Sequence, residues 1–137
     1  MEAIGLAASI VSLIETTTKV VKYLDDVKDA PKERAELASE ANILLRLLHS
    51  LKGRVDQANL TDPWFVGLQS LDVPGGLLHQ YKVSMHKLAR KLEPAHGVKK
   101  VGKALVWAID KQEVKEVLIK IERLKTTIGL ELQKDHL

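Results

Sequence analysis

A long helical pattern at the start of the chain limits the folds that this sequence can adopt. Apolar residues and one threonine recur at steps of three and four, the spacing of one helix face: Leu6, Ile10, Leu13, Thr17, Val20, Leu24 and Val27. An adjacent face steps in the same way: Ala7, Val11, Ile14, Thr18 and Val21. No charged residue lies between Ala3 and Ile14. A helix that is apolar nearly all round belongs in the centre of a bundle or enters lipid.

The composition favours helices over sheet. Of the 137 residues, 45% are apolar but only 4% are aromatic, so Leu, Val, Ile and Ala supply the core. This length predicts one domain with a core of its own. The absence of cysteine excludes a disulfide framework and a thiolate zinc site. A net charge of +3 is too small to indicate nucleic-acid binding.

Proline divides the first half of the chain into helices. Pro31 ends the first helix, predicted over residues 2–28, and suits the first turn of a second long helix. Pro63 lies in the first turn of a short helix that Thr61 or Asp62 caps. We expect the two aromatic residues of this short helix to fill one end of a bundle.

The second half of the chain contains two more long helical patterns. A heptad stripe predicts a helix from Leu78 to about Leu92, and a short helical segment follows within residues 98–108. The last long helix is predicted to begin after Asp110, which has the capping-box spacing to Glu113 three residues later. No strand pattern is present, so the sequence predicts an all-α fold, a single helical bundle of four long helices with short helical insertions.

No motif for catalysis, a cofactor or a metal is convincing. Residues 97–104 match a nucleotide-binding P-loop until Ala104, which replaces the Ser or Thr that holds magnesium, and no strand precedes them. No two histidines have the i,i+4 spacing of a helical metal site, although His79 and His86 could share one helix face. We therefore predict neither an enzyme nor a bound cofactor or metal.

A basic cluster lies in the second half of the chain, offset by Glu93 alone. Its members are Lys87, Arg90, Lys91, Lys99, Lys100 and Lys103. If the turn at Pro94 folds the two segments together, these charges share one end of the bundle and could hold anionic lipid headgroups. A solvated face without a partner is the alternative. Nucleic acid is not expected, because no aromatic residues interleave the basic ones.

Two stretches of this sequence resemble a known family. These are MEAIGLAASIVSLIETTTKVVKYLDDVKDAPKERAELASEANILLRLLHSL and ALVWAIDKQEVKEVLIKIERLKTTIGLEL. They are similar to the HeLo-like N-terminal domains of fungal STAND proteins, relatives of nucleotide-binding immune receptors. The resemblance spans about residues 1–133 and depends on the order and spacing of apolar patterns. Ala3 and Ala108 depart from it, since the family often has proline at both positions.

The resemblance implies a cell-death effector at the N-terminus of a longer protein. HeLo and HeLo-like domains are similar to the helical bundle of the mixed-lineage kinase domain-like pseudokinase and to the N-terminal domains of plant coiled-coil immune receptors. In that group a sensor, either a nucleotide-binding and repeat module or a short amyloid motif, triggers oligomerisation. An N-terminal apolar helix then leaves the bundle and attacks the plasma membrane. The domain is therefore expected in the cytoplasm at rest and at the plasma membrane once activated.

The membrane-attacking region carried over to this chain is residues 3–14, called the insertion segment below. Its apolar and small residues are Ala3, Ile4, Gly5, Leu6, Ala7, Ala8, Ile10, Val11, Leu13 and Ile14. Glu15 is expected to be the first buried or pore-facing charge. Twelve uncharged residues are fewer than the roughly 20 that span a bilayer, so insertion requires several assembled copies. Small residues allow close helix contact in lipid.

Two alternatives to membrane attack remain open at this point. The first helix can be an ordinary core helix, or the domain can be a non-lytic module that self-associates or binds partners through the same apolar surface. The chain ends at residues 134–137, just past its last helix, as expected of a domain within a longer protein.

Overall fold

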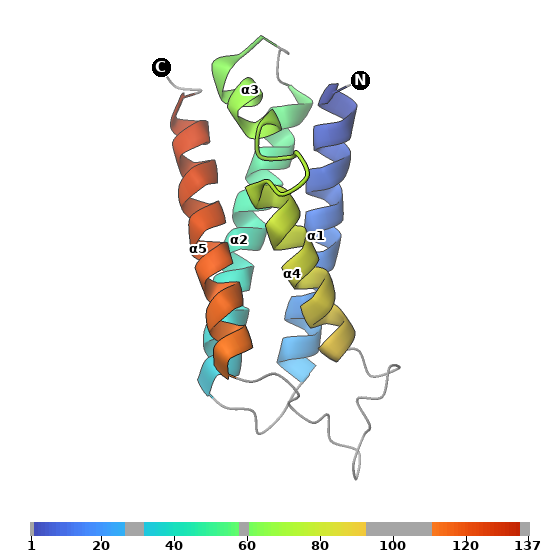
Figure 1. The fold of residues 1–137 in the computed structure, drawn as a ribbon, viewed down its shortest axis with the longest axis vertical. Helices are drawn as coiled ribbons and strands as arrows, with labels where there is room; N and C mark the ends of the chain where they lie inside the picture. The colour runs from blue at the N-terminus through green and yellow to red at the C-terminus, as the bar shows by residue number, and fades with distance from the viewer. Residues whose placement is uncertain (1, 27–31, 58–60, 93–110, 135–137) are drawn as a thin grey trace.

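The structure is a computed structural model that describes residues 2–26, 32–57, 61–92 and 111–134, and no strand occurs among them (Figure 1). The predicted all-α class is therefore confirmed. The described helices are α1 (Glu2–Asp26), α2 (Lys32–Asp56), α3 (Pro63–Gln69), α4 (Leu77–Leu92) and α5 (Lys111–Lys134). The predicted segment within residues 98–108 and the predicted cap Asp110 lie outside the described residues.

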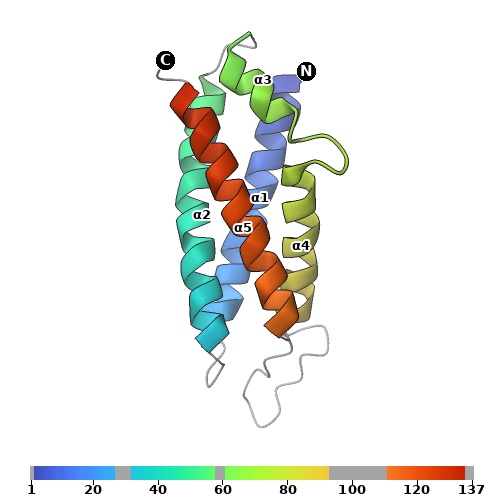
Figure 2. The same cartoon turned by 60° about the vertical axis from the view of Figure 1, so that its left-hand side comes forward.

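Four of these helices lie side by side along the long axis of the molecule. α1 contacts α2 and α4, and α5 contacts the same two helices, whereas α3 covers the end where α1 begins and α5 finishes (Figures 1 and 2). α1 and α4 run in the same direction, because side-chain hydrogen bonds join Ser9 to Asp72 and Thr17 to Tyr81, in the same order along both segments.

The predicted apolar stripes form the core between these helices. Buried members include Leu6, Ile10, Leu13, Leu37, Leu44, Leu48, Leu78, Met85, Leu88, Ile121, Leu124 and Ile128. The two aromatic residues of α3 are also buried and pack edge to face, with ring centroids 6.1 Å apart. This confirms that Trp64 and Phe65 fill one end of the bundle. Asp62 takes the N-cap position of α3, but its side chain makes no capping hydrogen bond.

α1 is less enclosed than its sequence predicts. Gly5, Ala8 and Val11 are exposed, and Val11 keeps 36% of its surface accessible. Of the two environments that the sequence left open for this helix, the centre of a bundle does not describe α1, because α1 packs mainly against α2 and α4 and leaves a third side outward. In the first half of α1, an uncharged helix face therefore already meets solvent.

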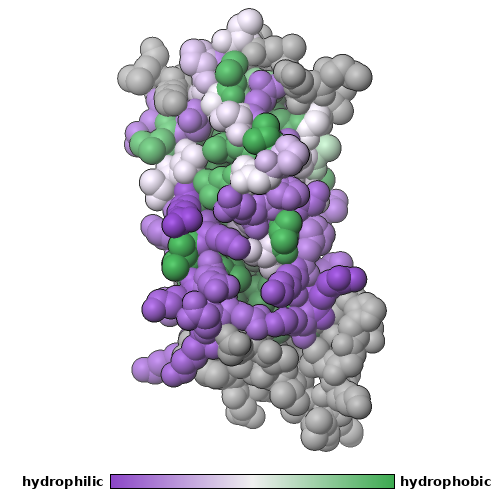
Figure 3. Space-filling view, viewed as in Figure 1, coloured by the Kyte–Doolittle hydropathy of each residue, from purple (hydrophilic) through white to green (hydrophobic). Residues whose placement is uncertain are grey.

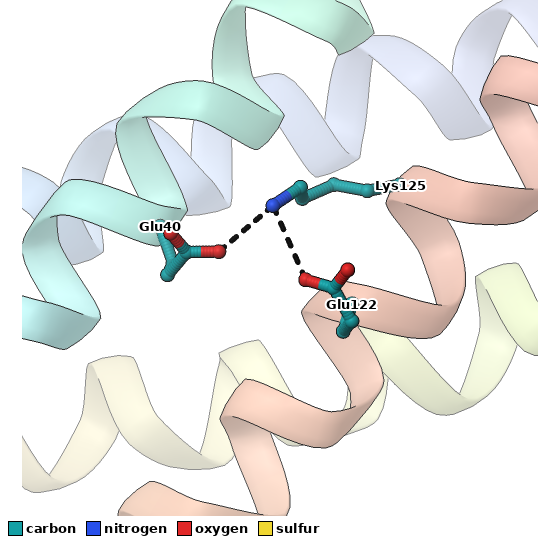
Figure 4. Close-up of polar contacts among 3 residues, drawn as sticks. All are labelled: Glu40, Glu122 and Lys125. Carbon is teal, nitrogen blue, oxygen red and sulfur yellow. Dashed lines mark hydrogen bonds and ion pairs between the residues drawn. The ribbon is translucent and has the colours of Figure 1, made fainter.

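A polar contact links α2 to α5 across the bundle surface (Figure 4). The Lys125 Nζ donates to Glu40 Oε1 at 2.8 Å and to Glu122 Oε2 at 3.2 Å. The hydrogen bond to Glu40 raises the pKa of Lys125 above its ordinary value. The resulting stabilisation is present below the ordinary lysine pKa and is lost as pH rises through the higher folded-state pKa. Both groups are partly exposed, so the pair contributes at most about 1 kcal/mol.

The turn between α3 and α4 depends on two glycines. Gly75 has a φ of +81°, which L side chains rarely adopt. A Cβ at Gly76 would lie 2.4 Å from the Leu71 carbonyl oxygen. Because backbone atoms cannot rotate away, this close approach excludes a side chain and fixes the path of the chain into α4.

We expect Gly76→Ala to destabilise the domain by about 1–3 kcal/mol through overpacking, measured as a lower Tm by circular dichroism. Gly129→Ala is the control, because a Cβ there meets nothing within 4 Å and alanine favours a helix interior by roughly 0.5–1 kcal/mol. A Gly76→Ala protein with a Tm raised as much as that of Gly129→Ala would contradict this description of the turn.

Candidate membrane-insertion site

The insertion segment forms the first half of α1 and has two different faces. Leu6, Ile10 and Leu13 are at most 1% exposed and lie in the core, an apolar row called the core seam below. Ala7 and Ile14 are half-buried, packed against the core. Gly5, Ala8 and Val11 are exposed, as described above, while the side chains of Ala3 and Ile4 lie outside the description. Among the described side chains, the core seam is therefore the fully buried row of the segment, and Ala7 and Ile14 pack beside it.

Two surface hollows flank the seat of this segment. One, of about 480 Å³, lies between the start of α1 and the α3–α4 connection, and Val66 and Val73 on its wall are about half exposed. The other, of about 320 Å³, lies between α1 and α4. Asp72 and Gly5 line both hollows. The segment is thus incompletely covered on the side of α3 and α4.

A hydrogen bond crosses between these two hollows. The Ser9 hydroxyl donates to the Asp72 carboxylate at 3.0 Å and is only partly buried. This bond holds the insertion segment in register with the α3–α4 connection. Water reaches it more readily than it reaches the core and can replace either partner, so breaking the bond costs little free energy.

A buried polar anchor follows the insertion segment along α1. The hydroxyls of Thr17 and Tyr81 share a hydrogen bond of 2.6 Å, and both residues are fully buried. Burial raises the pKa of Tyr81 above its ordinary value, because the phenolate would lose its hydration, and the Thr17 hydrogen bond partly opposes this. Separating α1 from α4 here strands a buried hydroxyl, which costs about 1–3 kcal/mol. The anchor therefore favours a boundary between the insertion segment and the rest of α1.

Glu15 was predicted to be either a buried charge or a pore-facing one, and it is not buried in this structure. Its side chain is exposed, on the side of α1 away from the core seam, between the exposed residues Val11 and Lys22. The expectation of a buried charge is therefore wrong for this conformation, because helical periodicity turns position 15 outward. A pore-facing role for Glu15 stays a prediction.

The predicted basic cluster is only partly described. Lys87 and Arg90 are exposed on α4, whereas Lys91 is half-buried and forms an ion pair with Glu113 of α5. Lys99, Lys100 and Lys103 lie outside the described residues, so their proximity to α4 stays a prediction. Hydrophilic side chains cover much of the lower half of the face shown in Figure 3, over α4 and α5.

Sequence reasoning noted that His79 and His86 could share a helix face, but it did not assign them or Lys82 to the basic cluster. His79, Lys82 and His86 recur at steps of three and four with Arg90, and they line one surface groove of about 490 Å³ together with Lys87. The signal was present in the helical spacing of these residues, but the charges were counted along the chain and not around the helix.

The described residues contain no group of three His, Cys, Asp or Glu side chains that could hold a metal ion. Within the described ranges, none of the helices combines the length and hydrophobicity needed to cross a bilayer. Comparison with known proteins finds no family model, no curated protein and no solved structure that matches this chain. The HeLo-like resemblance therefore depends on the residues quoted above and stays a prediction.

A double-mutant cycle tests the Thr17–Tyr81 anchor. Thr17→Val and Tyr81→Phe each leave one buried hydroxyl without its partner, so each should lower the free energy of unfolding by about 1–3 kcal/mol in urea denaturation. The double variant should lose less free energy of unfolding than the two single variants lose together, because it removes both hydroxyls and leaves neither one buried without a partner. Strictly additive losses would show that the two hydroxyls do not interact.

Proposed function

We propose that this chain is a non-enzymatic, HeLo-like effector domain, a bundle of four long helices that permeabilises the plasma membrane. A C-terminal or upstream sensor module gathers several copies by self-association. The insertion segment then leaves its seat and enters the bilayer from the cytoplasmic side. The observation that carries this proposal is the uncharged first half of α1, seated mainly by the core seam, with Ala7 and Ile14 beside it, and followed by the Thr17–Tyr81 anchor.

The energetics support a resting state that needs a trigger. Burying Leu6, Ile10 and Leu13 contributes roughly 1.5–3 kcal/mol for each side chain. Their loss to water would remove much of the roughly 5–15 kcal/mol that stabilises a typical domain. Transfer of the same side chains into lipid keeps them away from water, so the bilayer replaces the core as their environment.

Assembly supports insertion of a segment too short to span a bilayer alone. The exposed Gly5 and Ala8 permit close contact between copies in lipid, where small residues line helix interfaces. Glu15 then lies at the end of the uncharged segment, where an ionisable side chain requires a water-filled interior or the membrane surface.

A non-lytic interaction module is the second candidate. The exposed Val11 and Ala8 on α1, with Val66 and Val73 near its start, form apolar surface that another copy or a partner helix could cover. In this case the domain self-associates through the outer side of α1 and does not enter lipid.

Ala8→Glu separates these two functions. Ala8 is exposed, so the substitution should change folding stability by less than about 0.5 kcal/mol. A charge in the bilayer centre costs about 2.5–3.5 kcal/mol per copy. We therefore expect the domain, fused to an inducible oligomeriser, to release dye from anionic liposomes, and Ala8→Glu to lose most of this release.

Thr18→Glu is the matched control, because it adds the same charge to an exposed site of α1 beyond the insertion segment. It should release dye as the unmodified domain does. Full release by a folded Ala8→Glu protein would overturn insertion of this segment. Folded, oligomeric proteins that release no dye at all would favour the non-lytic module.

A further inference from the structure

One face of α4 carries basic side chains from His79 to Arg90, and Lys82, Lys87 and Arg90 give it positive charge at neutral pH. We call this the α4 cationic face and define it by the residues His79, Lys82, His86, Lys87 and Arg90. All are exposed except Lys82, which is half-buried. α4 contains four basic residues and no acidic one, so no negative charge on the helix itself offsets this face.

An ion pair between α4 and α5 neutralises Lys91, which lies on the other flank of α4 and pairs with Glu113. On that same flank the Lys120 ammonium of α5 donates to the Ser84 hydroxyl at 2.6 Å, which marks the side of α4 that faces α5. Among the described residues, no ion pair joins an acid to Lys82, Lys87 or Arg90. The α4 cationic face therefore keeps its charge available.

The α4 cationic face borders the insertion segment. His79 and Lys82 line the 320 Å³ hollow together with Gly5, Ser9 and Leu13 of α1 and with Asp72, whose carboxylate accepts the Ser9 hydroxyl. The first part of the α4 cationic face therefore lies at the boundary with α1, and the groove that holds His86, Lys87 and Arg90 continues from it along α4. A partner bound at His79 and Lys82 would reach the seat of the insertion segment.

We infer that the α4 cationic face binds the anionic headgroups of a lipid bilayer and places the α1–α4 boundary against the membrane before insertion. This inference rests on the proposed function. It differs from the cluster predicted from sequence, because it uses the side of the bundle and not its end. Charge complementarity indicates an anionic partner, at about a fivefold gain in binding for each basic residue near the surface.

A bilayer fits this surface better than a nucleic acid does. Val83 lies within the α4 cationic face with 54% of its surface exposed, and the uncharged residues Gly5 and Ala8 lie on the neighbouring helix. Apolar residues flanked by basic ones are typical of elements that lie in a membrane interface. No Phe, Tyr or Trp side chain is exposed on α4 for base stacking, since Tyr81 is buried.

Vesicle co-sedimentation tests this inference on the unfused chain. We expect binding to phosphatidylserine-containing vesicles, weakened by salt, and little binding to phosphatidylcholine alone. Lys82→Gln/Arg90→Gln should weaken binding about 30-fold. Lys115→Gln/Arg123→Gln is the control, because it removes two exposed basic residues from α5 and lowers the net charge equally. Circular dichroism would confirm that both variants fold.

Equal weakening by both variants would overturn the inference, because net charge alone would then explain the binding. Failure of the unmodified chain to bind any of the vesicles would also overturn the inference. So would binding to duplex DNA instead of vesicles, if Lys82→Gln/Arg90→Gln lost that binding and the control variant kept it. Vesicle binding through α4 without dye release by the oligomerised domain would support the inference and count against the proposed function. Dye release that survives Lys82→Gln/Arg90→Gln would count against the inference alone.

Discussion

The burial of the core seam is the constraint on which the rest of the structure depends. Leu6, Ile10 and Leu13 must lie away from water, and the resting bundle meets this need between α1, α2 and α4. The same need can be met by lipid, because the hydrophobic effect depends on removal from water and not on the identity of the apolar environment. A single row of side chains therefore connects the stability of the fold to the proposed activity.

Polar contacts divide α1 into parts of different character. The Thr17–Tyr81 hydrogen bond is fully buried, so breaking it strands a hydroxyl in the core. The Ser9–Asp72 contact lies between two hollows, where water can replace either partner. The two glycines of the α3–α4 turn set the path of the segment that carries Asp72. In the proposed mechanism, this arrangement lets the first half of α1 leave the bundle while the second half stays anchored.

Helical periodicity predicted which side chains enter the core but not how many neighbours each helix has. The stripe from Leu78 to Leu92 and the core seam both lie where spacing placed them. The exposure of Ala8 and Val11 could not be predicted, because small and apolar residues suit both a buried and an outward face.

The candidate site was harder to predict than the core, because charges act through space. The partner of Lys91 is Glu113, which lies 22 residues away on another helix, so sequence order gave no sign that this charge is neutralised. Conversely, the spacing of His79, Lys82 and His86 predicts one helix face, but sequence order gives no sign that His79 and Lys82 lie beside α1.

The most direct measurement of the central claim is dye release by a domain whose insertion segment is tied to its seat. The chain has no cysteine, so Ser9→Cys/Asp72→Cys would create one thiol pair, at two positions whose hydroxyl and carboxylate oxygens lie 3.0 Å apart, that a short reducible bis-methanethiosulfonate linker can join. If the insertion segment must leave the bundle, the cross-linked, oligomerised domain will not release dye from anionic liposomes, and a reductant will restore release. Equal release with the cross-link intact would contradict the account.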